Sequence, residues 1–446
     1  MPNAAPPMPP AATIPRVAGL PVLGNTPAFL RDARALVLDA QAKHGDVFEV
    51  RILGQAVTVL MSPQATKEVY VDRRDTFSSE RGWSFTIGPL FARGLMLRDF
   101  DDHHLHRRVM QHAFRRAALA GYMQRVNGLA RQHVAAAVQQ AGPDGVDVYT
   151  MTKRLTLDIA AQVFVGLDLG REAQVVNDAF VAMMRASVWP VRHEIPGTPF
   201  ARGMAARRRL QALLGGLVAQ RRAAPEGADL LSRLAHATTE AGRPLATDEV
   251  VDHMIFLLLA AHDTTTATLT VMLWHLSQQP AWQDRVAAEL GSLAGQDVTI
   301  DNHKALTDTE LVMAEALRLS PPVPFSPRGV VRDCEVDGVP LRGGQMIALA
   351  SLGLHRHPAW WTEPDRFDPQ RFAPDRAEDR QHSHLYVPFG GGAHICLGNH
   401  LAELMTKAVM AAVLAEHRVT ARAGQRMEMA AVPIPKPRGG LVLTIA

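Results

Sequence analysis

One cysteine near the C-terminus, Cys396, lies in a glycine-rich segment that leads directly into an apolar, helix-forming stretch at 401–419. The segment reads Phe389-Gly-Gly-Gly-Ala-His-Ile-Cys-Leu-Gly398. Because the first N–H groups of a helix lack intrahelical partners and the helix dipole is positive there, a thiolate at this position is stabilised. Glycines allow tight turns, so several N–H groups can point at the sulfur. The pattern favours a metal ligand or a reactive nucleophile; the alternative is a buried structural cysteine in an ordinary turn.

The segment resembles the haem-ligand loop of the cytochrome P450 family, whose pattern is Phe-x-x-Gly-x-(Arg/His)-x-Cys-x-Gly. All five fixed positions are matched, by Phe389, Gly392, His394, Cys396 and Gly398. The resemblance implies that Cys396 is the axial ligand of a haem b, and that its electron donation favours O–O cleavage. The resemblance extends from about residue 20 to the end of the chain.

The chain changes character near Pro321. Residues 62–319 are mostly amphipathic and helical in pattern, whereas a Pro-rich meander follows at 358–379. Short β-like segments are predicted at 48–53, 56–61, 334–341, 345–350 and 440–445. We therefore expect a mainly α protein with a smaller β-rich lobe, an α+β chain. The resemblance implies the P450 fold, with the haem between the helical and sheet lobes.

No internal repeat or linker divides the sequence, so we expect a single P450 domain over residues 20–446 after a flexible Pro/Ala-rich tail at residues 1–19. The tail lacks the basic and apolar regions of a signal peptide. The most apolar run, Met254–Ala261, is too short to cross a bilayer. The two cysteines, Cys334 and Cys396, form no disulfide framework. These features predict a cytoplasmic protein without a membrane anchor.

An acid and a hydroxyl interrupt the long apolar helix that we expect to begin near Thr247. They are Asp263 and Thr264, in the run Ala260-Ala-His-Asp-Thr-Thr265. Buried polar groups are costly unless they are hydrogen-bonded or functional, and a threonine bonded to the carbonyl one turn earlier can open a helix. The run is similar to the P450 oxygen-activation motif, with Ala261 where glycine is usual. The resemblance implies a proton relay to dioxygen; the alternative is a polar seam against another helix.

Glu315 and Arg318 lie three residues apart and share a helix face, so they can form an ion pair. The spacing alone is common on solvated helices. The resemblance implies that the pair engages Arg371 in a buried network that braces the cysteine loop, with Gln370 where glutamate is often found. Because breaking a buried pair is strongly destabilising, we expect a structural role.

A haem has two propionates, which need cationic or hydrogen-bonding partners. The resemblance supplies four of them: His103, Arg107, Arg328 and His394. It also places Phe389, Gly392, Gly398 and Ala260 against the cofactor. A rival interpretation is a metal cluster at His103, His104 and His106, but zinc sites on helices favour i,i+4 histidines, and no pair among these three has that spacing.

The substrate pocket is expected, by family position, to be apolar and rich in aromatic residues and methionine. Its predicted residues are Phe85, Ile87, Phe91, Met184, Phe256, Ala260, Pro324, Phe325 and Ile434. Such a pocket suits a lipophilic substrate. The alternative for each residue is a place in the ordinary core.

The resemblance thus implies a soluble haem-thiolate monooxygenase that inserts one oxygen atom of O2 into a lipophilic small molecule. No dinucleotide fingerprint follows a strand, so electrons are expected from a ferredoxin or flavodoxin with an NAD(P)H-dependent reductase. We expect a monomer that binds no nucleic acid, since the net charge is only +3 and no recognition motif accompanies the arginines. The alternatives are a peroxide-driven peroxygenase and a non-enzymatic haem-thiolate sensor.

Four arginines predict where an acidic electron donor docks. They are Arg107, Arg108, Arg115 and Arg116, which we expect on one short helical segment. In the family this helix borders the face nearest the cysteine ligand, and a cationic patch there steers an acidic partner.

Overall fold

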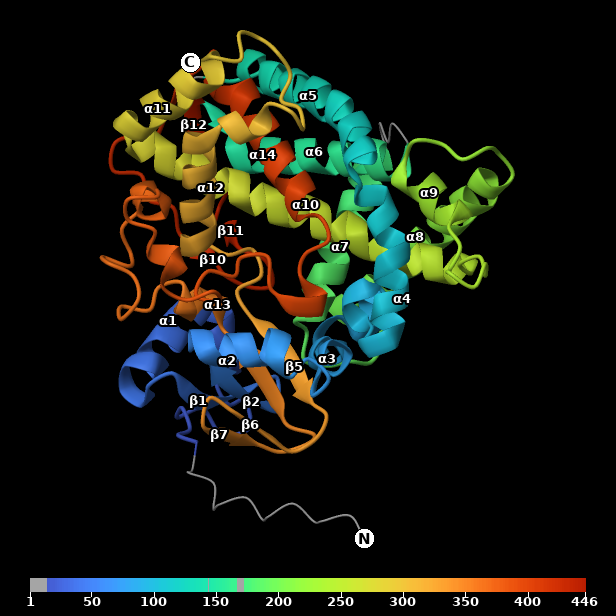
Figure 1. Ribbon diagram of the computed structural model, residues 1–446, viewed down its shortest axis with the longest axis vertical. Helices are drawn as coiled ribbons and strands as arrows, with labels where there is room; N and C mark the ends of the chain where they lie inside the picture. The colour runs from blue at the N-terminus through green and yellow to red at the C-terminus, as the bar shows by residue number, and fades with distance from the viewer. Residues whose placement is uncertain (1–13, 143, 167–171) are drawn as a thin grey trace.

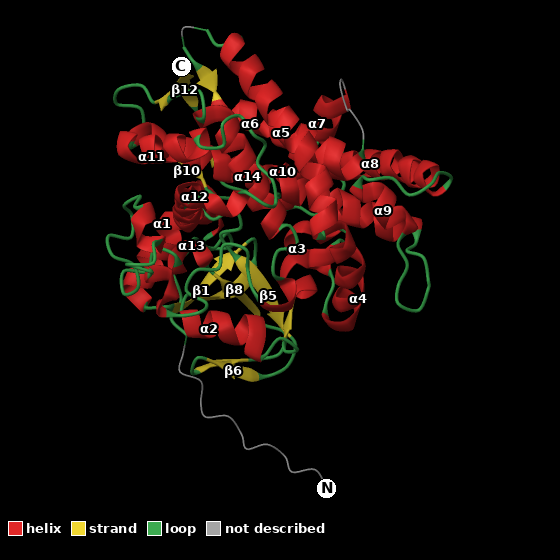
Figure 2. Cartoon of the chain, turned by 45° about the horizontal axis from the view of Figure 1, so that its top comes forward, coloured by secondary structure: helices red, strands yellow, loops and turns green. Residues whose placement is uncertain are grey.

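The computed structural model describes residues 14–142, 144–166 and 172–446. Helices fill one end of the molecule, and the main sheet and its flanking helices lie at the other (Figure 1). Coloured by secondary structure, the larger part is helical and the strands gather in the smaller part (Figure 2). The predicted α+β class with a helical and a sheet-rich lobe is therefore confirmed.

The main sheet has five strands in the order β1-β2-β8-β5-β3. Their bounds are Val47–Ile52 (β1), Gln55–Leu60 (β2), Phe77–Ser78 (β3), Ser326–Val330 (β5) and Met346–Leu349 (β8). The β1–β2 hairpin turns at Gly54, whose φ of 84° is one that glycine adopts without strain. β8 joins β2 in parallel, so segments about 290 residues apart in sequence share one sheet.

Three smaller sheets complete the strands. Their members are Val146–Asp147 (β4), Val419–Thr420 (β9) and Val442–Ile445 (β12); Cys334–Val336 (β6) and Val339–Leu341 (β7); and Met429–Ala430 (β10) and Lys436–Pro437 (β11). β12 pairs with both β4 and β9, which ties the C-terminus to the helical part.

The α-helices pack into one large apolar core and two smaller clusters beside the strands. They are Thr26–His44 (α1), Pro63–Lys67 (α2), Ser79–Phe91 (α3), Phe100–Gln111 (α4), Arg116–Gln139 (α5), Val148–Ala160 (α6), Glu172–Ser187 (α7), Pro199–Arg222 (α8), Leu230–His236 (α9), Thr247–Gln278 (α10), Pro280–Gly291 (α11), Thr307–Leu319 (α12), Ser351–Leu354 (α13) and Asn399–Leu414 (α14). Short 3-10 and π turns continue several of these helices; one of them, Gly392–His394, belongs to the cysteine loop.

The helix α10 runs through the middle of the helical part, where it packs against α6, α8, α12 and α14. It begins at Thr247, as predicted, and the Ala246 N–H donates to the Glu249 carboxylate at 2.7 Å, which satisfies one unpaired donor of the first turn. By length and hydropathy alone α10 could cross a membrane, but 72% of its most apolar window is buried inside the protein. It is therefore the core helix of this fold.

Two predicted boundaries differ from the structure. The tail, predicted to end at residue 19, ends earlier, because the Glu49 N–H donates to the Pro15 carbonyl and the Val17 N–H donates to the Glu49 carbonyl; residues 1–13 lie outside the described residues. The apolar stretch at 401–419 is not one helix, because α14 ends at Leu414 and Val419 pairs with Ile445 of β12.

Candidate active site

The cysteine loop folds tightly against the segment that follows α2. Gly392 has a φ of 61°, and a side-chain carbon there would lie 1.8 Å from the Tyr70 carbonyl oxygen. Only glycine fits this position. The Cys396 N–H donates to the Phe389 carbonyl at 2.9 Å and closes the loop, two residues before the Gly398 cap of α14. Gly398, by contrast, has no such crowding, since the nearest atom lies 3.8 Å away.

The Cys396 thiol sits at this loop beside a positive charge. Burial among protein atoms raises the pKa of the Cys396 thiol, while a hydrogen bond from the Gly398 backbone and the Arg107 charge lower it less strongly. The Cys396 residue is nevertheless exposed, so the loop presents its sulfur to an added group. A coordinated metal ion deprotonates a thiol outright, so ligation remains compatible with this environment. Cys334, the other cysteine, lies on β6 and is free.

Three of the four predicted propionate residues surround one cavity of about 210 Å³; they are His103, Arg328 and His394. The rings of His103 and His394 stack with their centroids 3.9 Å apart. Burial lowers the pKa of His103 to about 4, and the Nδ1 atom of this ring is buried without a hydrogen-bond partner. Within the described residues no carboxylate lies at ion-pair distance from the buried Arg328 guanidinium. The cavity therefore offers polar groups that the described chain leaves unsatisfied.

The fourth predicted residue, Arg107, lies apart from that cavity. Its Nη1 donates to the Ile395 carbonyl at 2.7 Å, so it joins α4 to the cysteine loop one residue before the ligand. The neighbouring histidines do not converge on a common point. His106 contacts His253 of α10 at 2.9 Å, whereas His103 stacks on His394.

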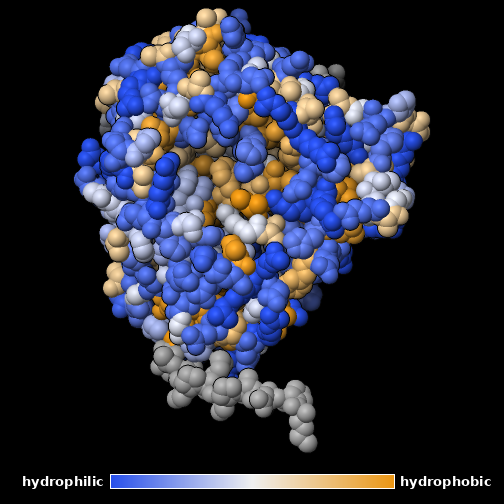
Figure 3. Space-filling view, viewed as in Figure 1, coloured by the Kyte–Doolittle hydropathy of each residue, from blue (hydrophilic) through white to orange (hydrophobic). Residues whose placement is uncertain are grey.

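A stripe along α10 is less buried than the rest of that helix. Phe256, Ala260 and Thr264 are half-buried at a spacing of four residues, which places them on one helix face. The Thr264 hydroxyl donates to the Ala260 carbonyl at 2.5 Å, which is the back-bond that the sequence predicted. The visible face of the molecule is hollowed near its middle, with hydrophobic residues in the hollow (Figure 3), where α10, α14 and the cysteine loop lie in Figure 1.

Asp263 is held by two basic side chains. Its Oδ1 lies 3.1 Å from His262 Nε2 and 3.5 Å from Lys153 Nζ on α6. Burial raises the pKa of Asp263, but His262 and Lys153 outweigh burial and lower it to about 2. The carboxyl is thus ionised at neutral pH, which differs from the protonated acid that a simple relay would use.

The neighbouring threonines form the polar seam that was the alternative for this region. Thr266 of α10 meets Thr156 of α6 with their hydroxyl oxygens 2.7 Å apart, and Thr270 meets Thr152 at 3.4 Å. The seam begins one turn after Asp263 and faces α6. Thr264, which bonds only within its own helix, is not part of these pairs.

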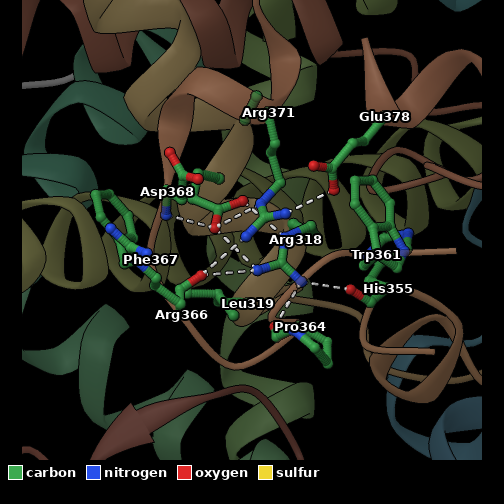
Figure 4. Close-up of polar contacts among 12 residues, drawn as sticks. Arg318, Leu319, His355, Trp361, Pro364, Arg366, Phe367, Asp368, Arg371 and Glu378 are labelled. Carbon is green, nitrogen blue, oxygen red and sulfur yellow. Dashed lines mark hydrogen bonds and ion pairs between the residues drawn. The ribbon is translucent and has the colours of Figure 1, made fainter. Parts of the chain in front are cut away.

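The brace, defined here as Glu315, Arg318 and Arg371, is completely buried. Glu315 accepts two hydrogen bonds from Arg318, at 2.7 and 2.9 Å, and one from Arg371 at 3.2 Å (Figure 4). Glu378 supplies the second carboxylate, at 2.7 Å from Arg371 Nη1. Gln370 stands where glutamate is often found, but Arg371 still has a second carboxylate partner because Glu378 pairs with it.

The brace reaches the cysteine loop through His355. Arg318 Nη1 donates to the His355 carbonyl at 2.7 Å, and the His355 ring accepts from the Val387 N–H at 3.0 Å. The Val387 carbonyl in turn accepts from the Gly390 N–H, at the first glycine of the loop. Three consecutive hydrogen bonds thus join the brace to the loop that carries Cys396.

A family model described as "Cytochrome P450" matches residues 15–442. The chain belongs to the cytochrome P450 family. It is 36% identical over 439 residues to cytochrome P450 136 of Mycobacterium tuberculosis, across 96% of this chain and 87% of that protein. It is 28% identical over 445 residues to abscisic acid 8'-hydroxylase 2 of Oryza sativa, across 95% of this chain and 84% of that protein.

A solved structure, "Retinoic acid bound cyanobacterial CYP120A1", superposes with a TM-score of 0.90 at 26% identity, over 98% of this chain and 100% of that one. The P450 fold and the assignment as a P450 monooxygenase are thereby confirmed.

Membership of the cytochrome P450 family implies a haem with a cysteine thiolate ligand. The residues present fit this group. Cys396 would ligate the iron. The buried His103 Nδ1 and the Arg328 guanidinium, whose Nη1 donates to the Ser326 hydroxyl and the Pro327 carbonyl, would meet the anionic propionates. Ala260 is half-buried on α10.

The predicted pocket residues of this P450 divide into two groups. Phe85, Met184, Phe256, Ala260, Phe325 and Ile434 are half-buried, whereas Ile87, Phe91 and Pro324 are buried. Phe91 is 1% exposed within the main core, so its ordinary-core alternative is favoured. Phe325 packs against Phe29 of α1 with ring centroids 5.4 Å apart. The pocket assignment as a whole stays a prediction.

The predicted donor-docking arginines do not lie on one helical segment, because α4 ends at Gln111 and α5 begins at Arg116. Arg108 forms an exposed ion pair with Glu240, and Arg116 forms one with Asp301. Arg115 contacts His112 at 3.2 Å and has no carboxylate partner within the described residues. The positive patch is weaker than the sequence suggested.

Sequence reasoning missed Lys153, His262 and Glu378. Lys153 is distant in sequence from Asp263. Glu378 lies seven residues after Arg371, in an irregular segment whose spacing indicates no contact. His262 is completely buried, and its place as a polar residue next to Asp263 in an apolar helix is the signal that could have identified it.

Proposed function

We propose that this P450 inserts one oxygen atom of O2 into a lipophilic organic substrate, by hydroxylation or epoxidation, with a haem b ligated by Cys396. Electrons come from a separate ferredoxin or flavodoxin and its NAD(P)H-dependent reductase. The enzyme acts as a monomeric single domain over residues 20–446 in the cytoplasm. Two free cysteines suit that reducing compartment.

The stripe of α10 carries this proposal. Phe256 and Ala260 are apolar and half-buried, and the Thr264 hydroxyl follows one turn later on the same helix face. An apolar wall that ends at a hydroxyl suits an apolar substrate held beside a proton-handling group. Relatives whose names mention abscisic acid and retinoic acid support a lipophilic substrate.

When bound, the haem supplies the activation of dioxygen, and the chain manages the protons. His262 Nδ1 lies 3.0 Å from the Leu258 carbonyl; because a carbonyl can only accept, Nδ1 carries a proton. The other ring nitrogen lies 3.1 Å from Asp263 Oδ1 but makes no hydrogen bond there. The ionised Asp263 carboxylate, which also lies 3.5 Å from Lys153 Nζ, can accept a proton and pass it on beside Thr264.

Turnover experiments test the proposal. With a surrogate ferredoxin system and a lipophilic compound that shifts the ferric haem to high spin, we expect oxygenated product, and far less with peroxide alone. Product with peroxide only would support a peroxygenase, and spin shifts without turnover would support a sensor; either result contradicts the proposal.

Two variants test the proton-handling residues. Thr264→Ala is expected to keep haem and substrate binding but to lower product formed per NAD(P)H, and Asp263→Asn to slow turnover by about 100-fold. Thr268→Ala is the matched control, because Thr268 makes the same back-bond one turn later, to the Thr264 carbonyl. Unchanged rates and coupling in both test variants would leave only the polar seam.

A further inference from the structure

A second and larger cavity, of about 800 Å³, lies apart from the cysteine loop. It is bordered by α1, the C-terminal part of α10, the turn after α12 and the β10–β11 hairpin, elements that lie together on one side of both ribbon views (Figures 1 and 2). Trp274 of α10 lines it, roughly 15 Å along the helix axis from Thr264. None of the propionate residues and no residue of the cysteine loop lines this cavity, but Pro324, one of the predicted substrate-pocket residues, does.

One wall of the cavity is apolar. It is formed by Leu38, Val271, Trp274, Leu319, Pro324, Leu352 and Met429. Both the rigid indole ring and the flexible methionine side chain make good contacts with an aliphatic or alicyclic body. The volume falls within the range of about 300–1,000 Å³ that is typical of sites for small organic molecules.

The charged wall contains more cations than its carboxylates neutralise directly. Arg31, Arg34, Arg356 and Arg438 line the cavity. Arg356 is 7% exposed; its Nη1 bonds to Asp365 and its Nη2 to the Leu319 carbonyl, but its Nε is buried without a hydrogen-bond partner. Burial, and next the nearby Arg34 charge, lower the pKa of Arg356 to about 10. A buried donor and a crowded pair of cations both favour an added anion.

The carboxylates that line the cavity do not meet this need. Asp365 is 75% exposed and already bonds to Arg356, and Asp32 accepts from the Ala35 N–H. Within the described residues, Glu428 makes no ion pair and Arg34 has no carboxylate partner. The cationic side of the cavity thus remains open to an external anion.

We propose that this cavity binds an amphipathic carboxylate, with its carboxyl group on Arg34 and the Arg356 Nε and its apolar body along Trp274 and Leu319. The site shares Pro324 with the predicted substrate pocket but no residue with the cavity lined by His103, Arg328 and His394, so it is expected to fill whether or not the iron is accessible. The shape and chemistry of the two walls match such a molecule, because a fully apolar ligand would leave the buried Nε unpaired and a small inorganic anion would leave the apolar wall uncovered.

Fluorine NMR of the holoenzyme tests this site. The six tryptophans are replaced by fluorotryptophan, the haem is kept as the diamagnetic ferrous carbon monoxide complex so that its axial site is blocked, and Trp274→Phe assigns the Trp274 signal. Dodecanoate is expected to shift that signal saturably, and the corresponding alcohol to bind about tenfold more weakly or worse, because it lacks the charge-assisted hydrogen bonds.

Charge reversal at Arg34 separates a specific site from general attraction. Arg34→Glu, an exposed position on α1, is expected to weaken dodecanoate binding by about tenfold or more. Lys43→Glu is the matched control, because Lys43 is exposed on the same helix and does not line the cavity, and it should bind like the parent. Equal affinity for acid and alcohol, equal loss in both variants, or a Trp274 signal that does not move would each overturn the proposal.

Discussion

The brace and the haem-side cavity, the cavity of about 210 Å³ lined by His103, Arg328 and His394, use the same kinds of side chain in opposite ways. In the brace each of the two buried arginines meets a carboxylate, and Glu315 also accepts from the Asp368 N–H at 2.8 Å. At the haem side, His103 Nδ1 is buried without a partner, and Arg328 donates to the Ser326 hydroxyl and the Pro327 carbonyl but forms no ion pair with a described carboxylate. A buried charge or donor without a partner is costly, so we expect an added ligand to complete this set.

The difference separates two kinds of arginine that look alike in the sequence. Arg318 and Arg371 are satisfied by the fold, and their loss should be felt as lost stability. Arg328 and His103 are completed by an added group, and their loss should be felt as lost ligand affinity. This contrast between stability and affinity can be measured in both regions.

The largest expected effect is on the brace. Glu315→Ala removes the carboxylate between two buried guanidinium groups and is expected to cost about 3–5 kcal/mol of unfolding free energy, because it leaves buried charge uncompensated. Glu363→Ala is the control, since its ion pair with Arg366 is exposed and should contribute at most about 1 kcal/mol. Urea denaturation of both variants measures the two losses of unfolding free energy. Similar losses would mean that the buried brace stabilises the fold no more than an exposed ion pair does.

Low pH is expected to reduce the unfolding free energy through His355, which links the brace to the cysteine loop. Burial, with the Arg318 and Arg356 charges, lowers the pKa of His355 to about 3, so between pH 6.5 and 3 the unfolded chain binds a proton that the folded chain does not. Stability therefore falls as the pH drops below about 6.5, by about 2 kcal/mol at pH 5 for this group. The ring also cannot accept from Val387 once it is protonated.

Urea unfolding at pH 7 and pH 5 measures this effect. His355→Gln should remove about that share of the pH dependence, while His193→Gln, at an exposed position, should leave it unchanged. A His355→Gln protein with the full acid sensitivity of the parent would show that this histidine is not responsible.

A smaller effect is expected at the haem side. His103→Phe keeps a ring against His394 but removes the unpaired nitrogen, so we expect about tenfold faster haem loss to an acceptor protein, from one lost hydrogen bond of about 1 kcal/mol or slightly more. The stability of the haem-free chain should not fall. Unchanged haem retention together with a destabilised haem-free chain would mean that His103 contributes to stability, as the brace residues do, and not to haem affinity. That result would contradict the contrast between the two regions.

The smallest effect concerns the surface arginines. Arg115→Glu is expected to slow the first electron transfer from an acidic ferredoxin several-fold at low salt and little at high salt, because exposed charges are screened. Arg108→Glu should have less effect, since Glu240 already offsets Arg108. Stopped-flow reduction at two ionic strengths makes the comparison, and equal rates in the parent and both variants would remove these arginines from the docking surface.

Local patterns were sufficient for much of the fold and for part of the site. The β1–β2 hairpin followed from alternating residues around Gly54, and the i,i+3 spacing of Glu315 and Arg318 indicated their ion pair. The Thr264 back-bond is likewise a property of its own helix. In each case the interacting groups lie within a few residues of each other.

Contacts between distant segments were not predictable in this way. The helix α14 stops at Leu414 because Val419 pairs with a strand at the C-terminus, and Lys153 meets Asp263 only because α6 packs on α10. Arg107 was assigned to a propionate, yet its hydrogen bond to Ile395 depends on how the loop folds against α4. Periodicity and composition contain no information on such partners.

The central claim is that Cys396 is the haem ligand and that the other cysteine has no part in it. The direct measurement is the absorption spectrum of the reduced carbon monoxide complex of Cys396→Ser and Cys334→Ser. We predict that the strongly red-shifted Soret band is lost in Cys396→Ser and kept in Cys334→Ser, whose cysteine lies on β6 away from the loop. A red-shifted band that survives in Cys396→Ser would contradict the account.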